Sequence, residues 1–148
     1  QTHNTALATV YCPNNRLTAL DLSKNTALAT LACSRNQLTA LDLSQNTAIT
    51  ELYCNNNQLA ALDLSRNTAL TELYCNGNRL TTLDLSRNTE LTKIYCDDNP
   101  LTELNISNLS KIEEIVFGDN PEINVIANSQ TVVSDEVRHY MDGKRKTP

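Results

Sequence analysis

Apolar residues recur along this chain with one fixed period of 21 residues. In a representative unit Leu52, Cys54 and Leu59 are apolar, Asn57 is polar, and the residues between them are mostly hydrophilic. The five cysteines stand at positions 12, 33, 54, 75 and 96, so each unit carries one of them at the same place. Self-similarity over about 20 to 50 residues is typical of repeat architectures, whose units bury their apolar faces by stacking on one another. The pattern therefore predicts a solenoid.

The spacing within each unit predicts short strands rather than helices. Leu52 and Cys54 are two residues apart, so on a strand both side chains point to the interior while Tyr53 points outward. The second half of the unit, Leu62-Asp63-Leu64, also alternates but is too short for a stable helix. We expect a mostly β solenoid with a parallel sheet on its concave face and extended or 3₁₀ segments on its convex face.

Two rows of asparagines follow the same period. An asparagine side chain both donates and accepts hydrogen bonds, so stacked asparagines can satisfy the backbone groups that the turns leave unpaired inside a solenoid. We therefore expect two internal ladders. The first contains Asn15, Asn36, Asn57, Asn78, Asn99 and Asn120, and the second contains Asn4, Asn25, Asn46, Asn67 and Asn88.

The row of cysteines allows three interpretations. Zinc needs about four converging ligands, whereas a straight row offers each site only its two neighbours, so a metal site is disfavoured. Disulfides are awkward because the number of cysteines is odd and in-register parallel positions pair in poor geometry. The third interpretation, reduced thiols that act as small buried apolar side chains, fits the pattern best. We expect neither a metal nor a cofactor.

The unit L-x-x-L-x-C-x-x-N-x-L, followed by L-D-L-S-x-N-T-A-L, is a leucine-rich repeat pattern with cysteine in one apolar slot. It resembles the bacterial surface proteins of the internalin type. The resemblance is strongest to the internalin J-like members, whose repeats have 21 residues and a cysteine ladder. The resemblance covers residues 4–120. It implies a right-handed, horseshoe-like solenoid in an exported protein, secreted or at the bacterial cell surface. It also implies binding of a protein or a cell-surface molecule rather than catalysis.

The repeats set the expected domain organisation. Residues 1–128 are predicted to form the solenoid, with partial or degenerate units at both ends. In the sixth unit Phe117 takes the place of the cysteine, and after Asn120 the period is no longer recognisable. Residues 129–148 contain an alternating segment and the turn signal Asp142-Gly143. They are expected to form a capping strand or to begin a further module.

Composition narrows the function classes. Acidic residues outnumber basic ones by 17 to 12, a formal net charge of −5, whereas nucleic acid binding normally needs a basic face. No stretch approaches the roughly 20 apolar residues of a membrane span, so no membrane insertion is expected. The two histidines, His3 and His139, lie at opposite ends of the chain, and no set of unlike catalytic groups converges. We expect a monomer that is not an enzyme.

The outward positions of the predicted concave sheet form the candidate binding surface. Four of the five tyrosines share the phase between the inward leucine and cysteine. A phenol offers flat apolar area and one hydrogen-bonding group, which suits recognition of a protein or a glycan. The candidate ligand-binding residues are Tyr11, Tyr53, Tyr74, Tyr95, Glu51, Glu72, Arg35 and Asp97. The tyrosine row also has a purely structural explanation, because tyrosine favours strands and a duplicated unit copies its residues.

A second function class is open from sequence alone. Rows of threonines and aspartates form regular polar arrays, namely Thr26, Thr47, Thr68, Thr89 and Asp21, Asp42, Asp63, Asp84. A solenoid with such arrays could serve as a structural spacer or bind a regular surface such as ice or a glycan layer. The aspartate row is expected to be a solvated convex face, stabilised by bonds to nearby backbone N–H groups, with weak cation binding left open.

Overall fold

Eight three-residue strands make up the regular structure of this computed structural model, which describes residues 6–118 and 123–127. In order they are β1 (Thr9–Tyr11), β2 (Thr30–Ala32), β3 (Glu51–Tyr53), β4 (Glu72–Tyr74), β5 (Lys93–Tyr95), β6 (Glu103–Asn105), β7 (Glu114–Val116) and β8 (Asn124–Ile126). In every strand the middle residue is buried, and apart from Ala32 the two residues beside it are exposed or half-buried. The alternation predicted from the repeat is therefore confirmed.

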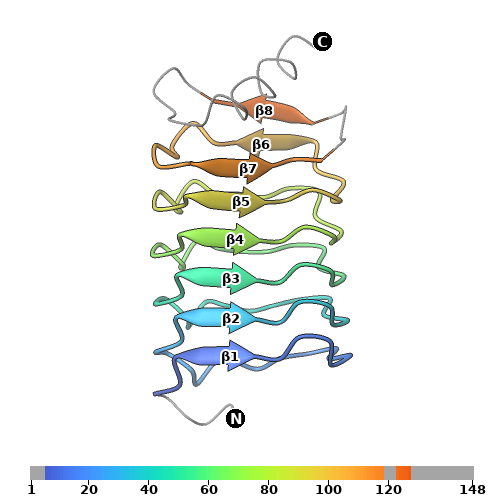
Figure 1. Cartoon of the computed structure of the whole chain (residues 1–148), viewed down its shortest axis with the longest axis vertical. Helices are drawn as coiled ribbons and strands as arrows, with labels where there is room; N and C mark the ends of the chain where they lie inside the picture. Colours follow the sequence, from blue (N-terminus) through green and yellow to red (C-terminus); the bar gives the residue numbers. More distant parts are fainter. Residues whose placement is uncertain (1–5, 119–122, 128–148) are drawn as a thin grey trace.

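Six of the strands form one parallel sheet, called the concave sheet below, in the order β1-β2-β3-β4-β5-β7. Neighbouring strands pair at a register of 21 residues, so Leu52 faces Leu31 on one side and Leu73 on the other. Figure 1 shows the resulting right-handed solenoid, in which the chain returns behind the sheet after each strand. The predicted leucine-rich repeat solenoid is confirmed.

The opposite, convex side consists mainly of extended return segments. No helix occurs in residues 6–118 and 123–127, so of the two conformations predicted for these segments the extended one is found. At the C-terminal end of the rod β6 and β8 pair in parallel, with Leu104 opposite Val125 (Figure 1). The 21-residue period thus continues past Asn120, which the sequence analysis did not recognise. The segment 129–148, predicted as a cap or further module, lies outside the described residues.

A continuous core of leucine, isoleucine and cysteine fills the space between the two sides. Leu52, Cys54 and Leu59 are completely buried, as the inward assignment requires. Burying one leucine side chain stabilises the fold by about 1.5–3 kcal/mol, so each stacked turn contributes mainly through its neighbours. The five cysteines are free thiols, four of them buried, which agrees with the third interpretation of the cysteine row. Phe117 is buried in the cysteine slot of the last turn.

The first asparagine ladder bridges successive turns. Asn57 Nδ2 donates to the carbonyl oxygens of Cys33 and Cys54, both at 3.1 Å. Its Oδ1 accepts a hydrogen bond from the Leu38 N–H at 3.1 Å. Corresponding bonds are made by Asn36, Asn78 and Asn99. Each side chain therefore satisfies backbone groups of its own turn and of the preceding turn, as predicted.

The second ladder lies beneath the return segments. Asn67 Nδ2 donates to the carbonyl oxygens of Leu43 at 3.1 Å and of Asn46 at 2.9 Å. Asn46 and Asn88 make the equivalent pair of bonds. The first ladder is confirmed from Asn36 to Asn99 and the second from Asn46 to Asn88. Asn15, predicted to begin the first ladder, is instead exposed, and its backbone N–H donates to Asn36 Oδ1 at 2.9 Å. Asn4 and Asn120, predicted as end members, lie outside the described residues.

The turn after each strand has a fixed backbone shape. The residue two positions after each cysteine has a positive φ, in the row Asn14 (60°), Arg35 (57°), Asn56 (59°), Gly77 (69°) and Asp98 (55°). Asparagine, aspartate and glycine tolerate this left-handed conformation better than other residues. Arg35 is the exception in the row. This bend directs the ladder asparagine, one residue later, back into the core.

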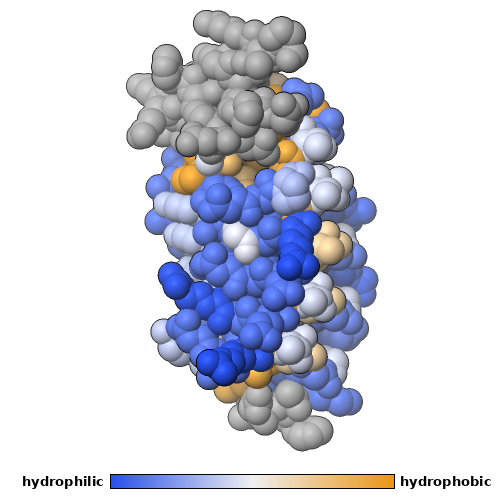
Figure 2. Space-filling model, turned by 90° about the vertical axis from the view of Figure 1, so that its right-hand side faces the viewer, coloured by the Kyte–Doolittle hydropathy of each residue, from blue (hydrophilic) through white to orange (hydrophobic). Residues whose placement is uncertain are grey.

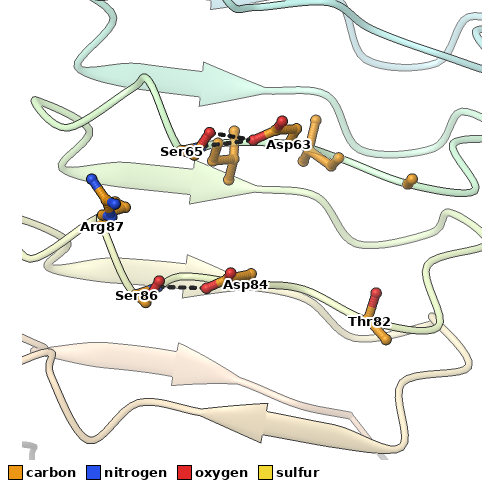
Figure 3. A pocket seen from close by; sticks show the side chains of 9 residues that line it. Asp63, Ser65, Thr82, Asp84, Ser86 and Arg87 are labelled. Atoms are coloured by element: carbon orange, nitrogen blue, oxygen red, sulfur yellow. Dashed lines mark hydrogen bonds between the residues drawn. The ribbon is translucent and has the colours of Figure 1, made fainter.

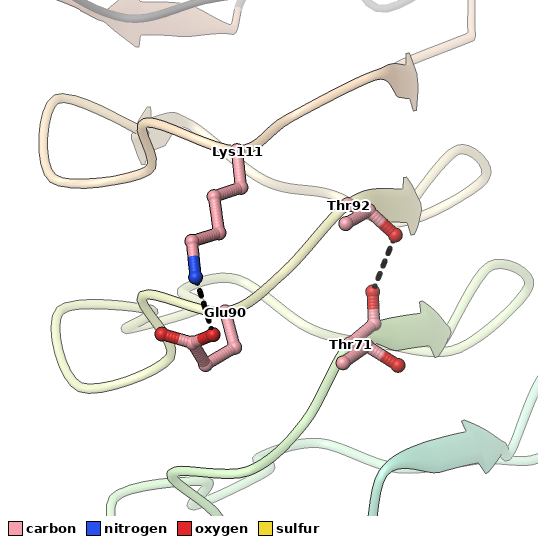
Figure 4. Close-up of polar contacts among 4 residues, drawn as sticks. All are labelled: Thr71, Glu90, Thr92 and Lys111. Atoms are coloured by element: carbon pink, nitrogen blue, oxygen red, sulfur yellow. Dashed lines mark hydrogen bonds and ion pairs between the residues drawn. The ribbon is translucent and has the colours of Figure 1, made fainter.

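Outside the core the surface is polar. Figure 2 shows a predominantly hydrophilic face along the turns that follow the strands, with apolar colour near its two ends. On the side that leads into the strands, Thr92 Oγ1 donates to the Thr71 carbonyl at 3.1 Å (Figure 4). Lys111 Nζ lies 2.6 Å from Glu90 Oε1 in an exposed ion pair, which contributes at most about 1 kcal/mol. The stability therefore comes from the core and the ladders.

Candidate functional site on the concave sheet

Three tyrosines on β3, β4 and β5 form a stack on the outer surface of the concave sheet. The register places Tyr53, Tyr74 and Tyr95 side by side. The ring centroids of Tyr53 and Tyr74 are 4.9 Å apart with an interplanar angle of 30°, and those of Tyr74 and Tyr95 are 4.6 Å apart at 14°. Strands in a sheet are about 4.8 Å apart, so the rings stack without distorting the sheet. All three side chains are half-buried.

Glutamates beside the stack raise the pKa of the two outer phenols. The Tyr53 hydroxyl donates to Glu51 Oε1 at 2.8 Å. Burial, followed by this hydrogen bond, raises the pKa of Tyr53 well above its ordinary value of 10. At the other end a hydrogen bond with Glu114, followed by burial, raises the pKa of Tyr95 to about 12. Both phenols therefore remain protonated at neutral pH, and the bond to Glu51 orients the Tyr53 ring.

The flank that contains these carboxylates, called the acidic flank below, is the register row Glu51, Glu72, Lys93 and Glu114. Burial and the neighbouring Glu72 raise the pKa of Tyr74, and Lys93 opposes this effect. Lys93 forms no ion pair within the part of the chain that the structure describes. With three carboxylates to one ammonium group, this flank attracts cations.

The opposite flank follows the strands and consists of Asn55, Asn76 and Asp97. Asp97 is half-buried, and burial raises the pKa of its carboxyl. Its Oδ1 atom is buried and has no hydrogen-bond partner among the described residues. An unpaired buried acceptor costs free energy, and the cost is greater when the carboxyl is charged, which agrees with its raised pKa.

Two of the residues predicted for the site lie apart from the stack. Tyr11 belongs to the same outward row, but the register places Ala32 between it and Tyr53, and Tyr11 is 77% exposed. Arg35 is exposed in its left-handed turn and forms no ion pair within residues 6–118 and 123–127. The structure thus groups the other six predicted residues around the stack and leaves these two nearer the N-terminal end.

Two residues of the acidic flank, Lys93 and Glu114, were not among the predicted site residues. Glu114 raises the pKa of the last tyrosine of the stack, and Lys93 is the single cation of the flank. The signal that identifies them is the repeat itself, since they follow Glu72 at intervals of 21 residues. Sequence reasoning selected tyrosines by type and gave less weight to the register of their neighbours.

The convex side has a shallow hollow of about 410 Å³ between two return segments (Figure 3). Its lining includes Asp63, Asp84 and Arg87. Asp63 Oδ1 already accepts hydrogen bonds from the Ser65 N–H at 2.9 Å and from its hydroxyl at 2.7 Å. These bonds lower the pKa of the carboxyl. The aspartate row therefore stabilises the return turns, as predicted, which makes it a weaker candidate for a ligand site than the tyrosine stack.

Among the residues that the structure describes, no three side chains of histidine, cysteine, aspartate or glutamate come together as a metal site. In the same residues no helix is long and apolar enough to cross a membrane.

Comparison with solved structures identifies the repeat family. No protein-family model matches the sequence, and no curated protein does. A structure described as the functional domain of InlJ from Listeria monocytogenes, which includes a cysteine ladder, is 38% identical to this chain over 88% of its length, with a TM-score of 0.78. The chain is an internalin-type leucine-rich repeat domain. It spans 31% of the length of that InlJ chain.

Other leucine-rich repeat structures resemble this internalin-type domain more distantly. The LRIM1/APL1C complex contains a chain that is 25% identical over 83% of the domain and 24% of its own length, with a TM-score of 0.73. The internalin inlF from Listeria monocytogenes str. 4b F2365 is 16% identical, with a TM-score of 0.57 over 88% of the domain and 56% of the inlF chain. The inlF likeness concerns the fold alone.

Proposed function

We propose that this internalin-type domain is a non-catalytic binding module of an exported bacterial protein, and that its concave sheet recognises a protein partner. The observation that carries the proposal is the stack of Tyr53, Tyr74 and Tyr95, half-buried on the sheet and bordered by charged flanks. Similarity to InlJ supports the export and the bacterial source, and the LRIM1/APL1C complex is an example of such repeats in a protein assembly.

The stack has the physical properties of an interface anchor. Tyrosine contributes large flat area with few rotatable bonds and is enriched among residues that dominate binding energy. Stacking and the hydrogen bond from Tyr53 to Glu51 hold the rings in place before any partner arrives. Little side-chain entropy is then lost on binding, so more of the contact energy is expressed as affinity.

The charges around the stack favour a partner with a basic or neutral surface. The acidic flank and the half-buried Asp97 lie on the two sides of the tyrosines. Complementary charge mainly accelerates association and selects among partners, and its effect falls as salt concentration rises. Binding through this surface should therefore weaken as sodium chloride is raised from low to physiological concentration.

A binding screen against immobilised cell-surface proteins and glycans tests the proposal. The native chain is compared with a Tyr53→Ala/Tyr74→Ala/Tyr95→Ala variant whose folding is checked by circular dichroism. A matched control, Gln45→Ala/Arg66→Ala/Arg87→Ala, changes three exposed residues of the return segments instead. We expect a protein to bind the native chain and the control but not the tyrosine variant.

The other outcomes contradict the proposal in separate ways. A protein that binds the tyrosine variant but not the control would place the interface on the convex side. Binding of glycans alone would keep the concave surface but change the class of ligand. If no partner binds, the result would favour the alternative function, a structural spacer.

A further inference from the structure

The central tyrosine of the stack and the glutamate beside it have unpaired polar ends. On β3 the Tyr53 hydroxyl donates to Glu51 Oε1 at 2.8 Å. Tyr74 and Glu72 occupy the same two positions on β4. Within residues 6–118 and 123–127, however, neither the Tyr74 hydroxyl nor the Glu72 carboxylate forms a hydrogen bond or an ion pair. These two groups are therefore the ones that the centre of the stack offers to a partner.

The charges of the acidic flank are concentrated at its β3–β4 end. The register places Glu51 directly opposite Glu72, about 4.8 Å away at the usual strand spacing. On the far side of Glu51 the row continues with the uncharged Thr30, and on the far side of Glu72 it continues with Lys93, which separates Glu72 from Glu114. Both carboxylates of the adjacent pair are half-buried, so solvent and salt screen them less than fully exposed charges. This pair is therefore the part of the flank that attracts a cation most strongly.

A guanidinium group suits this pair of carboxylates better than an ammonium group does. A guanidinium is planar and presents five N–H donors in a fixed fork, so a single group can donate to two carboxylates one strand apart. Glu51 Oε1 already accepts from Tyr53, which leaves its other oxygen and both oxygens of Glu72 as acceptors. The half-buried rings beside them give the apolar stem of an arginine a surface to lie on. An ammonium is a compact and strongly hydrated point charge, which gains less from such a surface.

We propose that the protein partner presents an arginine whose guanidinium bridges Glu51 and Glu72 on the surface of the concave sheet, with its aliphatic stem across Tyr53 and Tyr74. The inference rests on the proposed function and names the anchoring side chain of that partner. The arginine lies at the β3–β4 end of the flank, away from the ammonium group of Lys93, and the site takes arginine in preference to lysine.

Nuclear magnetic resonance with N-acetyl-L-argininamide tests this inference without knowledge of the partner. The probe is titrated at physiological salt into the full chain with ring-labelled tyrosines, and we expect saturable shifts of Tyr53 and Tyr74 that exceed those of Tyr95. N-acetyl-L-citrullinamide has nearly the same shape without the charge and should bind at least about tenfold more weakly. N-acetyl-L-lysinamide should also bind more weakly. Shifts that do not saturate, shifts centred on Tyr95, or equal binding of the lysine probe would each overturn the inference.

Two variants with the same change of charge separate a site from a general attraction. Glu72→Gln removes one of the two proposed acceptors and should weaken binding of the arginine probe by about tenfold. Glu113→Gln removes an exposed carboxylate just before β7 and should weaken it by less than about twofold, because salt screens distant exposed charges. Equal effects of the two variants would refute the bridge. Lys93→Gln removes the neighbouring ammonium group and should tighten binding, whereas weaker binding would contradict the proposed position.

A partner found in the binding screen separates this inference from the proposed function. If the partner binds Glu72→Gln as tightly as the native chain but does not bind the variant without the three tyrosines, the concave-sheet function stands and the arginine inference fails. If the partner binds the convex side, the proposed function fails, and the inference about that partner fails with it. Loss of binding to both variants, with binding to Glu113→Gln retained, is the result that we expect.

Discussion

Asparagine occupies buried positions in this solenoid because its side chain completes sets of backbone hydrogen bonds that an apolar residue would leave open. Asn57 alone satisfies two carbonyl oxygens and one N–H from two turns. The spacing of the sequence was sufficient to predict both the burial and the ladder. Asn56, which directly precedes Asn57, has the same side chain but is exposed.

Replacing these two neighbours should therefore have unequal effects. Asn57→Ala leaves the Cys33 carbonyl, the Cys54 carbonyl and the Leu38 N–H without their side-chain partner, which should cost about 3 kcal/mol or more. Asn56→Ala keeps the backbone bond to the Asn76 carbonyl and should cost about 1 kcal/mol through its left-handed backbone. Urea unfolding of both variants measures the difference, and equal losses would contradict the ladder.

Cysteine at the centre of the array acts as an apolar side chain. Cys54 is completely buried and free. Cys54→Ser should cost about 1 to 3 kcal/mol, because a hydroxyl then replaces a thiol in an apolar environment. Cys12→Ser, at a half-buried position in the first turn, is the matched control and should cost less. Thermal unfolding measures both, and an unchanged melting temperature for Cys54→Ser would contradict its inward orientation.

At the scale of the element, the sequence predicts which residues form each strand, but it does not predict the contacts that their outward side chains make. Within each 21-residue unit, the alternation of apolar and polar residues determines which side chains of the strand point inward. It does not determine that Tyr53 bonds Glu51 within its own strand, or that Glu114 on the next strand of the sheet raises the pKa of Tyr95. Those choices depend on side-chain rotamers around several near neighbours. The pairing of β8 was also missed, because only Val125 repeats the apolar pattern of Leu104 clearly.

The cysteine row makes the stack of turns sensitive to alkaline pH. Burial raises the pKa of Cys33 and Cys96 from 9.0 to about 12. Between these values the unfolded chain loses thiol protons that the folded chain retains, so stability should fall as pH rises from about 9 to 12. The melting temperature measured across this range should decline, and less steeply for Cys54→Ala. A parallel decline in both proteins would exclude the Cys54 thiol as a contributor.

At the scale of the molecule, the fold is a linear array in which each turn depends on its two neighbours. β3 and β4 are paired on both sides, whereas within the described residues β1 is paired only with β2. The overall architecture could be predicted almost completely from the repeat. The candidate site could be predicted only as a row of residue types, because the stacking of Tyr53, Tyr74 and Tyr95 depends on side-chain rotamers that the repeat does not specify.

The linear array predicts a gradient of local stability. Backbone amides of β1 should exchange with deuterium at least about tenfold faster than those of β3 and β4, because opening an end turn breaks one interface rather than two. Hydrogen exchange followed by mass spectrometry measures the gradient. Uniform protection from β1 to β5 would indicate that the solenoid opens only as a whole.

The ladder bonds also define the natural step of evolutionary change in this chain. Those that cross from one turn to the next join positions 19, 21 or 24 residues apart, always in adjacent turns. Insertion or loss of one whole unit therefore preserves every kind of bond and alters the rod by one strand spacing, about 4.8 Å. Any shorter insertion breaks the core and both ladders at once. Recombination between units can thus lengthen the row of tyrosines, or move the position at which Ala32 interrupts it, while the solenoid fold is kept.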